Sequence, residues 1–316
     1  MIRLSNEQLL ALLDYPSLIQ ALEQAFQAEI TVPMRHHHDY PNPSAGLDST
    51  LLLMPAWDDG QFVGLKIVTI SPNNSVHQLP SIQGSYTLFD LPTGRSILEM
   101  DAKVLTNLRT AATSALASQY LSRPDSKHLL IIGTGSLAPF LVAAHASNRP
   151  IDKVSVWGRT EQKAQRVLDT LDGNSYDLQV VSNLEEAIQT ADIISAATMS
   201  VEPLIYGKWL KPGQHLDLVG SYKSDMREAD DEVIRRSTLF VDTFQGATKE
   251  SGDLAIPIKT GVCRLEDIQA DLFGLCGGQH QGRTIEEEIT FFKSVGHALE
   301  DLAAAKLAYE RHKQNY

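Results

Sequence analysis

The chain has 316 residues, of which 43% are hydrophobic and 21% charged, and its formal net charge is −12. This length allows two domains of ordinary size, and the acidic balance excludes nucleic acid as the main partner, because no basic stripe is present to neutralise phosphates. No apolar run approaches the roughly twenty residues of a membrane span, and no signal-peptide pattern is present. The sequence therefore predicts a cytoplasmic protein that does not associate with membranes.

The predicted elements begin with a helix that opens at Ser5, where Gln8 three residues later completes a capping-box pattern. Apolar residues at helical spacing predict two short amphipathic helices in this first segment. Strand-like runs then follow at residues 51–55, 62–70 and 85–89, with turn residues between them. Because this region lacks a regular alternation of strands and helices, it predicts a separate domain with an antiparallel sheet, for substrate binding or dimerisation.

Strands and helices alternate in the next part of the chain. A helix is predicted at 106–121, and strands are predicted at 129–132, 154–157, 178–181, 193–196, 215–219 and 239–242. This spacing is typical of an α/β protein with a Rossmann-type doubly wound parallel sheet, here combined with an α+β domain. A long helix is expected from residue 286 to about 312, with Gly296 on its apolar stripe. We therefore predict a Rossmann domain over 109–285 and a substrate and dimerisation domain over 1–108, completed by the helix within 286–316.

The turn after the first of these parallel strands has the pattern of a dinucleotide-binding site. It reads Gly133, Thr134, Gly135, Ser136, Leu137 and Ala138. Gly133 permits the tight turn, Gly135 lets backbone N–H groups approach a pyrophosphate, and Ala138 allows the helix to pack closely on the strand. The helix N-terminus adds unpaired amides and the positive end of its dipole. Strand, glycine turn, helix and second strand together predict that a dinucleotide binds here.

The tip of the second strand indicates which dinucleotide is preferred. NAD-binding units usually carry an acidic residue there, which accepts hydrogen bonds from the ribose hydroxyls. Here the tip reads Gly158, Arg159 and Thr160, without a carboxylate. A cation and a hydroxyl donor suit a 2′-phosphate, so NADP(H) is the expected cofactor and NAD(H) the alternative. In the competing interpretation, Arg159 is a solvated surface charge.

Three cations are candidates for binding an anionic substrate: Arg35, Lys66 and Arg109. Lys66 lies inside an apolar strand, where lysine is rare without a partner, and Arg109 is expected in the first turn of its helix, where a cation opposes the dipole. Taken singly, each is better explained as a surface or salt-bridged residue, but together they would hold a carboxylate. The histidine run at 36–38 does not predict a metal site, because adjacent side chains cannot all face one ion.

Several motifs resemble those of the ornithine cyclodeaminase/μ-crystallin family, and they span nearly the whole chain. They are NLRTAATSA at 107–115, the glycine turn at 133–135, DMREAD at 225–230, KESGD at 249–253 and FKSVGHALED at 292–301. The resemblance implies an N-terminal substrate and dimerisation domain, a Rossmann domain and a homodimer. It also implies that Arg35, Lys66 and Arg109 hold the carboxylate of a small substrate, and that Lys66 assists proton transfer at the reacting carbon–nitrogen centre.

One departure from the family pattern distinguishes between its branches. Cyclodeaminases carry an aspartate where this chain has Tyr222, and a phenol does not replace a carboxylate base. Glu250 matches a μ-crystallin-like feature and is expected to face the imine nitrogen of the substrate. The resemblance therefore implies a ketimine reductase that converts Δ1-pyrroline-2-carboxylate to L-proline, or Δ1-piperideine-2-carboxylate to L-pipecolate. The strand-end residues expected along the nicotinamide are Ala197, Thr198, Val219, Gly220 and Ser221.

Two alternatives to an imino acid reductase stay open at the level of sequence. The first is an ornithine cyclodeaminase, which would convert L-ornithine to L-proline and ammonia. The second is a protein of another class, which binds NADPH and a small ligand without turnover, as μ-crystallin does. The three cations and Glu250 argue against the second alternative, because a binding protein does not need a carboxylate-binding group beside its cofactor.

Overall fold

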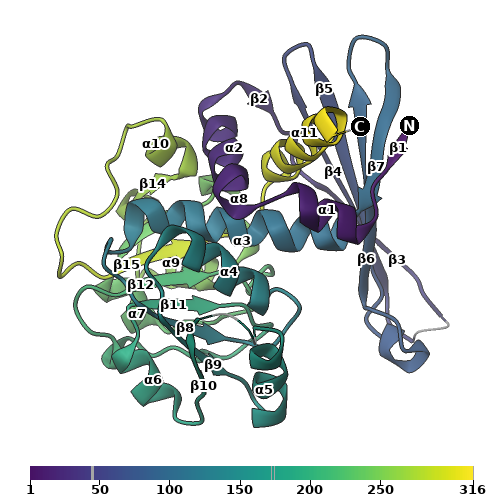
Figure 1. Ribbon diagram of the computed structural model, residues 1–316. Helices are drawn as coiled ribbons and strands as arrows, with labels where there is room; N and C mark the ends of the chain where they lie inside the picture. Colours follow the sequence, from purple (N-terminus) through teal and green to yellow (C-terminus); the bar gives the residue numbers. More distant parts are fainter. Residues whose placement is uncertain (44–45, 172, 174, 316) are drawn as a thin grey trace. The chain divides into compact units, whose positions relative to one another are not determined.

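The computed structural model describes residues 1–43, 46–171, 173 and 175–315 (Figure 1). The chain divides into two compact units. Unit 1 contains the residues up to Arg109 together with those from Ala298 onward, and unit 2 contains Thr110–His297. None of the described helices is both long enough and apolar enough to span a lipid bilayer.

Unit 1 is built around a sheet in the order β1-β7-β6-β5-β4-β2, with β3 paired to β4. The three predicted strand runs are confirmed, and they pair as antiparallel neighbours in the middle of this sheet. They are β4 (Ser49–Asp58), β5 (Phe62–Ile70) and β6 (Ile82–Asp90). The strands that the sequence does not predict are β1 (Ile2–Arg3), β2 (Ile30–Thr31), β3 (His36–Tyr40) and β7 (Arg95–Asp101). Strand β3 is an exposed edge strand, so it lacks the apolar alternation that reveals a half-buried strand.

Unit 1 also contains three helices, α1 (Asn6–Leu12), α2 (Tyr15–Gln27) and α11 (Ala298–Asn315); α11 packs on the sheet, and α1 and α2 pack against α11. The capping box is confirmed, because Gln8 N donates to Ser5 Oγ at 3.2 Å and Ser5 N donates to Gln8 Oε1 at 2.9 Å. Helix α11 packs against α2, β4 and β5 (Figure 1). The apolar face of α2 is buried there, including Leu18 and Leu22, each contributing about 1.5–3 kcal/mol. This packing places the first residues of α11 against the middle of β5.

Unit 2 is a parallel sheet in the order β10-β9-β8-β11-β12-β15-β13-β14, which confirms the predicted Rossmann-type doubly wound fold. Its strands are β8 (His128–Ile132), β9 (Lys153–Trp157), β10 (Asp177–Val180), β11 (Ile193–Ala196), β12 (His215–Leu218), β13 (Thr238–Val241), β14 (Ile268–Asp271) and β15 (Thr290–Lys293). Its α-helices are α3 (Ala102–Leu121, continuing from unit 1), α4 (Ala138–Asn148), α5 (Glu161–Asp169), α6 (Leu184–Thr190), α7 (Asp231–Arg236), α8 (Phe244–Glu250), α9 (Gly252–Thr260) and α10 (Leu272–Cys276). Short 3-10 turns lie at Asn74–His77, Gly207–Trp209 and Leu265–Asp267.

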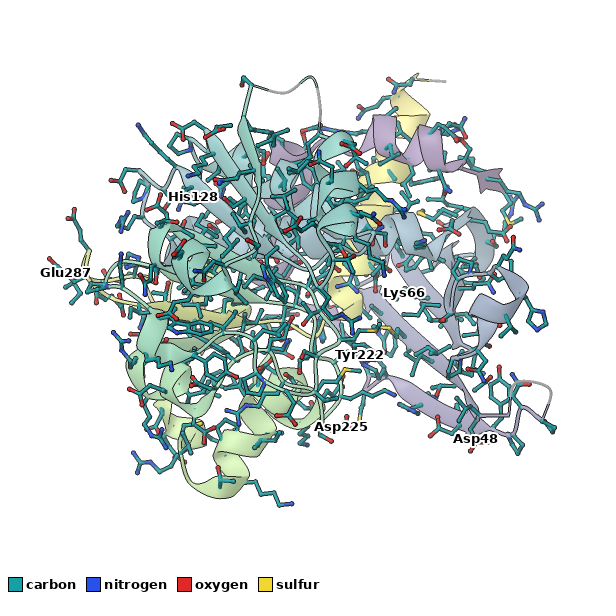
Figure 2. The ribbon with its side chains drawn as sticks, turned by 90° about the horizontal axis from the view of Figure 1, so that it is seen from below. Asp48, Lys66, His128, Tyr222, Asp225 and Glu287 are labelled. Carbon is teal, nitrogen blue, oxygen red and sulfur yellow. The ribbon has the colours of Figure 1, made fainter. Side chains whose placement is uncertain are left out.

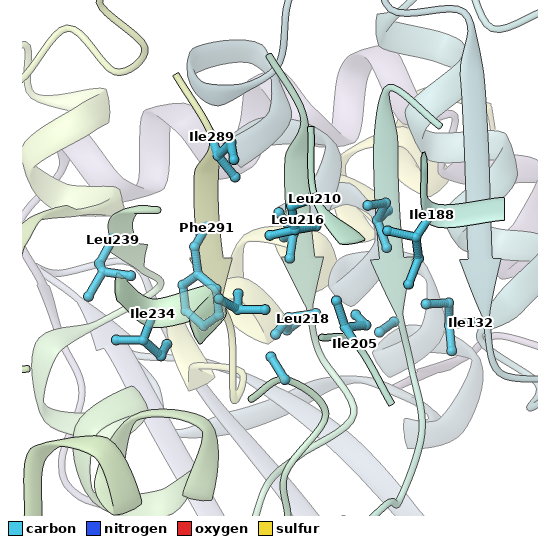
Figure 3. Close-up of a cluster of buried hydrophobic side chains, with 14 of the residues drawn as sticks. Ile132, Ile188, Ile205, Leu210, Leu216, Leu218, Ile234, Leu239, Ile289 and Phe291 are labelled. Carbon is cyan, nitrogen blue, oxygen red and sulfur yellow. The ribbon is translucent and has the colours of Figure 1, made fainter. Parts of the chain in front are cut away.

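A continuous apolar layer holds the unit 2 sheet to its helices (Figure 3). Ile132 on β8, Leu216 and Leu218 on β12 and Phe291 on β15 are all fully buried. Because both faces of a parallel sheet are covered, its strands read as continuous apolar runs rather than as alternating patterns. The core therefore explains why the sequence predicts β8, β9, β11, β12 and β13, whereas β14 and β15 are not predicted as strands.

The long helix predicted from residue 286 is wrong in its first part. Residues Thr290–Lys293 form β15, which lies between β12 and β13 in the sheet, and the helix begins only at Ala298. Gly296 lies outside it with φ +83°, a left-handed conformation that ends any continuous helix. The buried run TFFK satisfies both a helical stripe and a strand, so its apolar residues alone do not distinguish the two.

Candidate functional site

A buried group of charges lies in the middle of unit 1. Lys66, on β5, places its Nζ 2.6 Å from Asp301 Oδ2. Arg109, on α3, donates from Nε to Asp301 Oδ1 at 3.0 Å and makes a 2.5 Å ion pair with Glu300 Oε2. The side chains of Lys66 and Arg109 are only 3% and 5% exposed, and those of Glu300 and Asp301 are fully buried. Arg35 is close enough to lower the pKa of Lys66 through its charge. These five residues are called the Lys66 cluster below.

The Lys66 cluster perturbs the protonation of its own members. Burial lowers the pKa of Lys66 to about 8; Asp301 opposes this shift, while Arg109 and Arg35 add to it. Burial opposes ionisation of Asp301, yet the charges of Arg109 and Lys66 hold the pKa of that carboxyl below its usual value. The pKa of Arg109 is raised by Asp301 and Glu300 against the effect of burial. At neutral pH Lys66 and Arg109 are therefore cations and Asp301 is an anion.

The charge balance of the Lys66 cluster favours one further anion. Lys66, Arg109 and the half-buried Arg35 outnumber the two carboxylates of the cluster. Burying a net charge is costly unless a counter-charge is present. A substrate carboxylate beside these cations would therefore be favoured.

The predicted start of the helix that carries Arg109 is wrong. Arg109 does not lie in the first turn of its helix, because α3 begins at Ala102. Asp101 accepts hydrogen bonds from the amides of Lys103 and Val104, at 2.8 Å and 3.1 Å, and so satisfies the helix start. Arg109 is held by partners on α11 rather than by an effect of the helix dipole.

The two carboxylates that pair with Lys66 and Arg109 could not be identified from the sequence pattern. Glu300 and Asp301 stand in the first turn of α11, where acidic side chains are ordinary. The feature of the sequence that points to Glu300 and Asp301 is their place at the end of the FKSVGHALED motif.

In unit 2 the predicted glycine turn connects β8 to α4. Gly133 has φ +125°, and a Cβ atom there would lie 2.6 Å from the backbone oxygen of Ala197, so only glycine fits. Around Gly135 a Cβ atom would meet nothing within 4 Å. Gly135 and Ser136 are exposed, and no side chain caps the start of α4 at Leu137. An open, uncapped helix N-terminus after a tight glycine turn fits a pyrophosphate group.

The tip of β9 lies next to this turn. A Cβ atom on Gly158 would come within 2.5 Å of Thr134 Cγ2, so the missing side chain lets the two segments pack together. Arg159 and Thr160 follow, both exposed, and Thr160 is the N-cap residue of α5 without a side-chain capping bond. No described carboxylate forms an ion pair with Arg159, so its guanidinium is available to a ligand.

The other predicted cofactor residues follow β11 and β12. Thr198 and Gly220 approach each other so closely that a Cβ atom on Gly220 would lie 2.0 Å from Thr198 O. Ser221 is buried, and Tyr222, half-buried, stands on the loop after β12 (Figure 2). Glu250 is the last residue of α8 and is also half-buried. The structure thus brings together the residues after β11 with those after β12, within unit 2.

The histidine run forms part of β3, with every residue of that strand exposed. Within the described part of the chain, no group of three or more His, Cys, Asp or Glu side chains is arranged to hold a metal ion. The two cysteines, Cys263 and Cys276, are buried.

Comparisons with known proteins show to which family the chain belongs. Residues 4–315 match the ornithine cyclodeaminase/mu-crystallin family. The chain is 40% identical over 295 residues to a Δ1-pyrroline-2-carboxylate reductase of Paracoccus denitrificans, covering 93% of this chain and 91% of that protein. It is 38% identical over 259 residues to the ketimine reductase mu-crystallin of Mus musculus, covering 82% and 79%.

One solved structure is similar to this chain over its whole length. It is the Δ1-pyrroline-2-carboxylate reductase of Thermococcus litoralis in complex with NADH and L-proline, with a TM-score of 0.93 and 34% sequence identity. The alignment covers 100% of this chain and 98% of that one. The chain belongs to the ornithine cyclodeaminase/mu-crystallin family.

Proposed function

We propose that this member of the family is an NAD(P)H-dependent imino acid reductase, which converts Δ1-pyrroline-2-carboxylate to L-proline and also accepts Δ1-piperideine-2-carboxylate. The observation that carries the proposal is the Lys66 cluster, whose three cations outnumber its two carboxylates and suit a substrate that carries a carboxylate. The family relationship supports it, since relatives similar over most of their length are named as reductases of this substrate.

The residues of unit 1 would bind and orient the substrate. Arg109 and Arg35 bind its carboxylate, which restricts the planar imino acid to one orientation and lowers the entropy cost of the reaction. Lys66 carries a proton at neutral pH and can deliver it to the imine nitrogen, which makes the imine carbon more electrophilic. Glu250 in unit 2 is proposed to stabilise the positive charge of the protonated imine.

The residues of unit 2 would hold the cofactor. The glycine turn and the start of α4 bind the pyrophosphate, and the segments after β11 and β12 lie along the nicotinamide. The residues fit the group, because Gly135 leaves open space and the amides at the start of α4 have no side-chain cap. When bound, a reduced nicotinamide supplies the hydride.

A direct assay tests the proposed function. Purified protein should oxidise NADPH when Δ1-pyrroline-2-carboxylate is added, and the product should be L-proline. Absence of turnover with both cyclic imines would refute the proposal. Release of ammonia from L-ornithine with catalytic NAD⁺ would instead indicate a cyclodeaminase despite Tyr222. Binding of NADPH and a small ligand without turnover would indicate a binding protein. The homodimer and the cytoplasmic location remain predictions, and light scattering of the purified protein tests the first.

The pKa of Lys66 predicts the pH dependence of the reaction. If Lys66 supplies the proton, kcat/KM for imine reduction should fall as the pH rises through about 8, because the ammonium is lost. Oxidation of L-proline needs the neutral amine and should rise over the same range. Asp301→Asn should move the reduction limb to lower pH, since Asp301 raises the pKa of Lys66. A limb that stays in place in this variant would exclude Lys66 as the proton donor.

We propose that NADP(H) is preferred over NAD(H), on the grounds of Arg159 and Thr160. Arg159→Gln should raise KM for NADPH by about tenfold and leave KM for NADH almost unchanged, because only NADPH carries the 2′-phosphate. Arg166→Gln, at an exposed position later in α5, is the matched control and should change neither constant. Equal effects on both cofactors would contradict this assignment.

A further inference from the structure

A single buried carboxylate connects the ends of β11 and β12. Glu228 is 0% exposed. It accepts hydrogen bonds from Thr198 N at 2.7 Å and from Thr198 Oγ1 at 2.8 Å. It also accepts from Gly220 N at 2.8 Å and from Ser221 N at 3.3 Å. One side chain therefore fixes both strand-end segments that are proposed to lie along the nicotinamide.

The segment after β12 packs tightly against Thr198 and Glu228. A Cβ atom on Gly220 would lie 2.5 Å from Glu228 Oε1, in addition to its collision with the backbone of Thr198. The carboxylate thus lies directly behind the backbone of the segment after β12. Because all the donors to Glu228 are N–H or O–H groups, this arrangement suits the ionised carboxylate.

Two further buried charges face Glu228. Lys293, at the end of β15, has its Nζ 3.5 Å from Asp253 Oδ2 and 3.9 Å from Glu228 Oε2. Asp253, in α9, accepts hydrogen bonds at Oδ1 from the amides of Glu228 and Ala229, at 2.7 Å and 3.1 Å. All three charged side chains are 0% exposed. We call Glu228, Asp253 and Lys293 the Glu228 cluster; its members come from three separate family motifs.

The Glu228 cluster carries one net negative charge when its members are ionised. Two carboxylates face one ammonium group, and all three lie away from water, where a net charge is costly. Burial raises the pKa of Glu228 to about 7; Lys293 opposes this shift and Asp253 adds to it. A positive charge bound near the ends of β11 and β12 would relieve the cost.

We propose that the Glu228 cluster positions the nicotinamide-binding segments and, through its net negative charge, stabilises the oxidised cofactor relative to the reduced one. The proposal rests on the proposed function, since it requires a nicotinamide dinucleotide in unit 2. The reduced ring is neutral, whereas the oxidised ring is positively charged, so loss of a hydride with its electron pair to the imine carbon creates a positive charge. A fixed negative charge near the ring stabilises the positive charge that develops there, and so favours hydride transfer to the imine. Glu228, Asp253 and Lys293 act as positioning residues.

The first test compares the binding of the two cofactor forms. Dissociation constants for NADP⁺ and NADPH are measured for the wild type, Glu228→Gln and Asp253→Asn, after thermal unfolding has shown that the variants fold. Each substitution removes one negative charge, and the asparagine can still accept the amides of Glu228 and Ala229. The ratio of the NADP⁺ constant to the NADPH constant should rise about three- to tenfold in both variants. Glu287→Gln, at an exposed position, is the matched control and should not change the ratio.

The second test uses the wild type alone, so it does not depend on the variants folding. The same ratio should rise as the pH falls from 8 to 6, because Glu228 becomes protonated and the cluster loses a negative charge. Both cofactor forms carry the same phosphates, so the titration of the phosphates cancels in the ratio. A ratio independent of pH, or an unchanged ratio in folded variants, would overturn the proposal. Failure of the wild type to bind either form would refute the proposed function instead.

Discussion

Arg109→Ala should abolish most of the imine reduction and also destabilise unit 1. The substitution removes a charged hydrogen-bonding group from the substrate carboxylate, which should lower kcat/KM by about 10²- to 10³-fold. It also leaves Glu300 and Asp301 without their arginine partner in a fully buried position. Breaking a buried ion pair in this way typically lowers the free energy of unfolding by about 3–5 kcal/mol. Steady-state kinetics and urea unfolding measure the two effects.

A second variant separates the loss of activity from the loss of stability. Arg109→Lys retains the positive charge next to Glu300 and Asp301 but cannot make the paired hydrogen bonds of a guanidinium. It should therefore recover much of the stability and little of the activity. The affinity for NADPH should hardly change in either variant, because the proposed cofactor residues belong to unit 2. Wild-type kcat/KM in a folded Arg109→Lys or Arg109→Ala protein would refute the assignment of Arg109 to the substrate carboxylate.

Lys66→Met should lower kcat by about 10²- to 10⁴-fold, which is the usual contribution of a group that transfers a proton. The methionine has a similar length and suits the buried position on β5, while Arg109 still pairs with Asp301. The fold should therefore survive the change better than in Arg109→Ala. Stopped-flow measurement of NADPH oxidation, with cyclic imine in excess, isolates the chemical step from product release.

Two further variants show whether the charge or the proton of Lys66 matters. Lys66→Arg keeps a positive charge that does not lose its proton near neutral pH, so it should restore substrate binding without restoring kcat. Lys306→Met is the matched control: Lys306 pairs with Asp58 in the same unit, and its side chain is 25% exposed. Its loss should leave kcat unchanged. Full activity in Lys66→Arg would show that only the charge is needed.

Local patterns explain why much of the fold could be predicted from the sequence. The strands of unit 2 are short apolar runs, since residues such as Ile132 and Leu218 are buried by helices on both faces of the sheet. The start of α1 needs only Ser5 and Gln8, which lie one helical turn apart. The glycine turn could likewise be assigned, because its backbone requires glycine at Gly133. Each of these signals lies within a few residues of the structure that it predicts.

Where local patterns are ambiguous or polar, prediction failed. The run at Thr290–Lys293 is apolar enough for either a helix or a strand, and only its neighbours β12 and β13 make it a strand. Strand β3 is exposed throughout, so its sequence carries no burial pattern. The start of α3 was placed too late, because Asp101 was not identified as its capping residue.

The sequence by itself determined the class of the protein, a Rossmann unit combined with an antiparallel sheet, and it predicted a dinucleotide site at the glycine turn and a carboxylate site at three cations. Only the tertiary structure decided what surrounds those cations. Arg109 and Asp301 are 192 positions apart in the chain, yet they meet in a buried pair. Glu228, Asp253 and Lys293 similarly meet from three separate motifs. Which charges pair at such separations depends on which elements pack together. Burial then decides which of these charges need a partner. Because both depend on the tertiary structure, no local sequence pattern reveals the pairs.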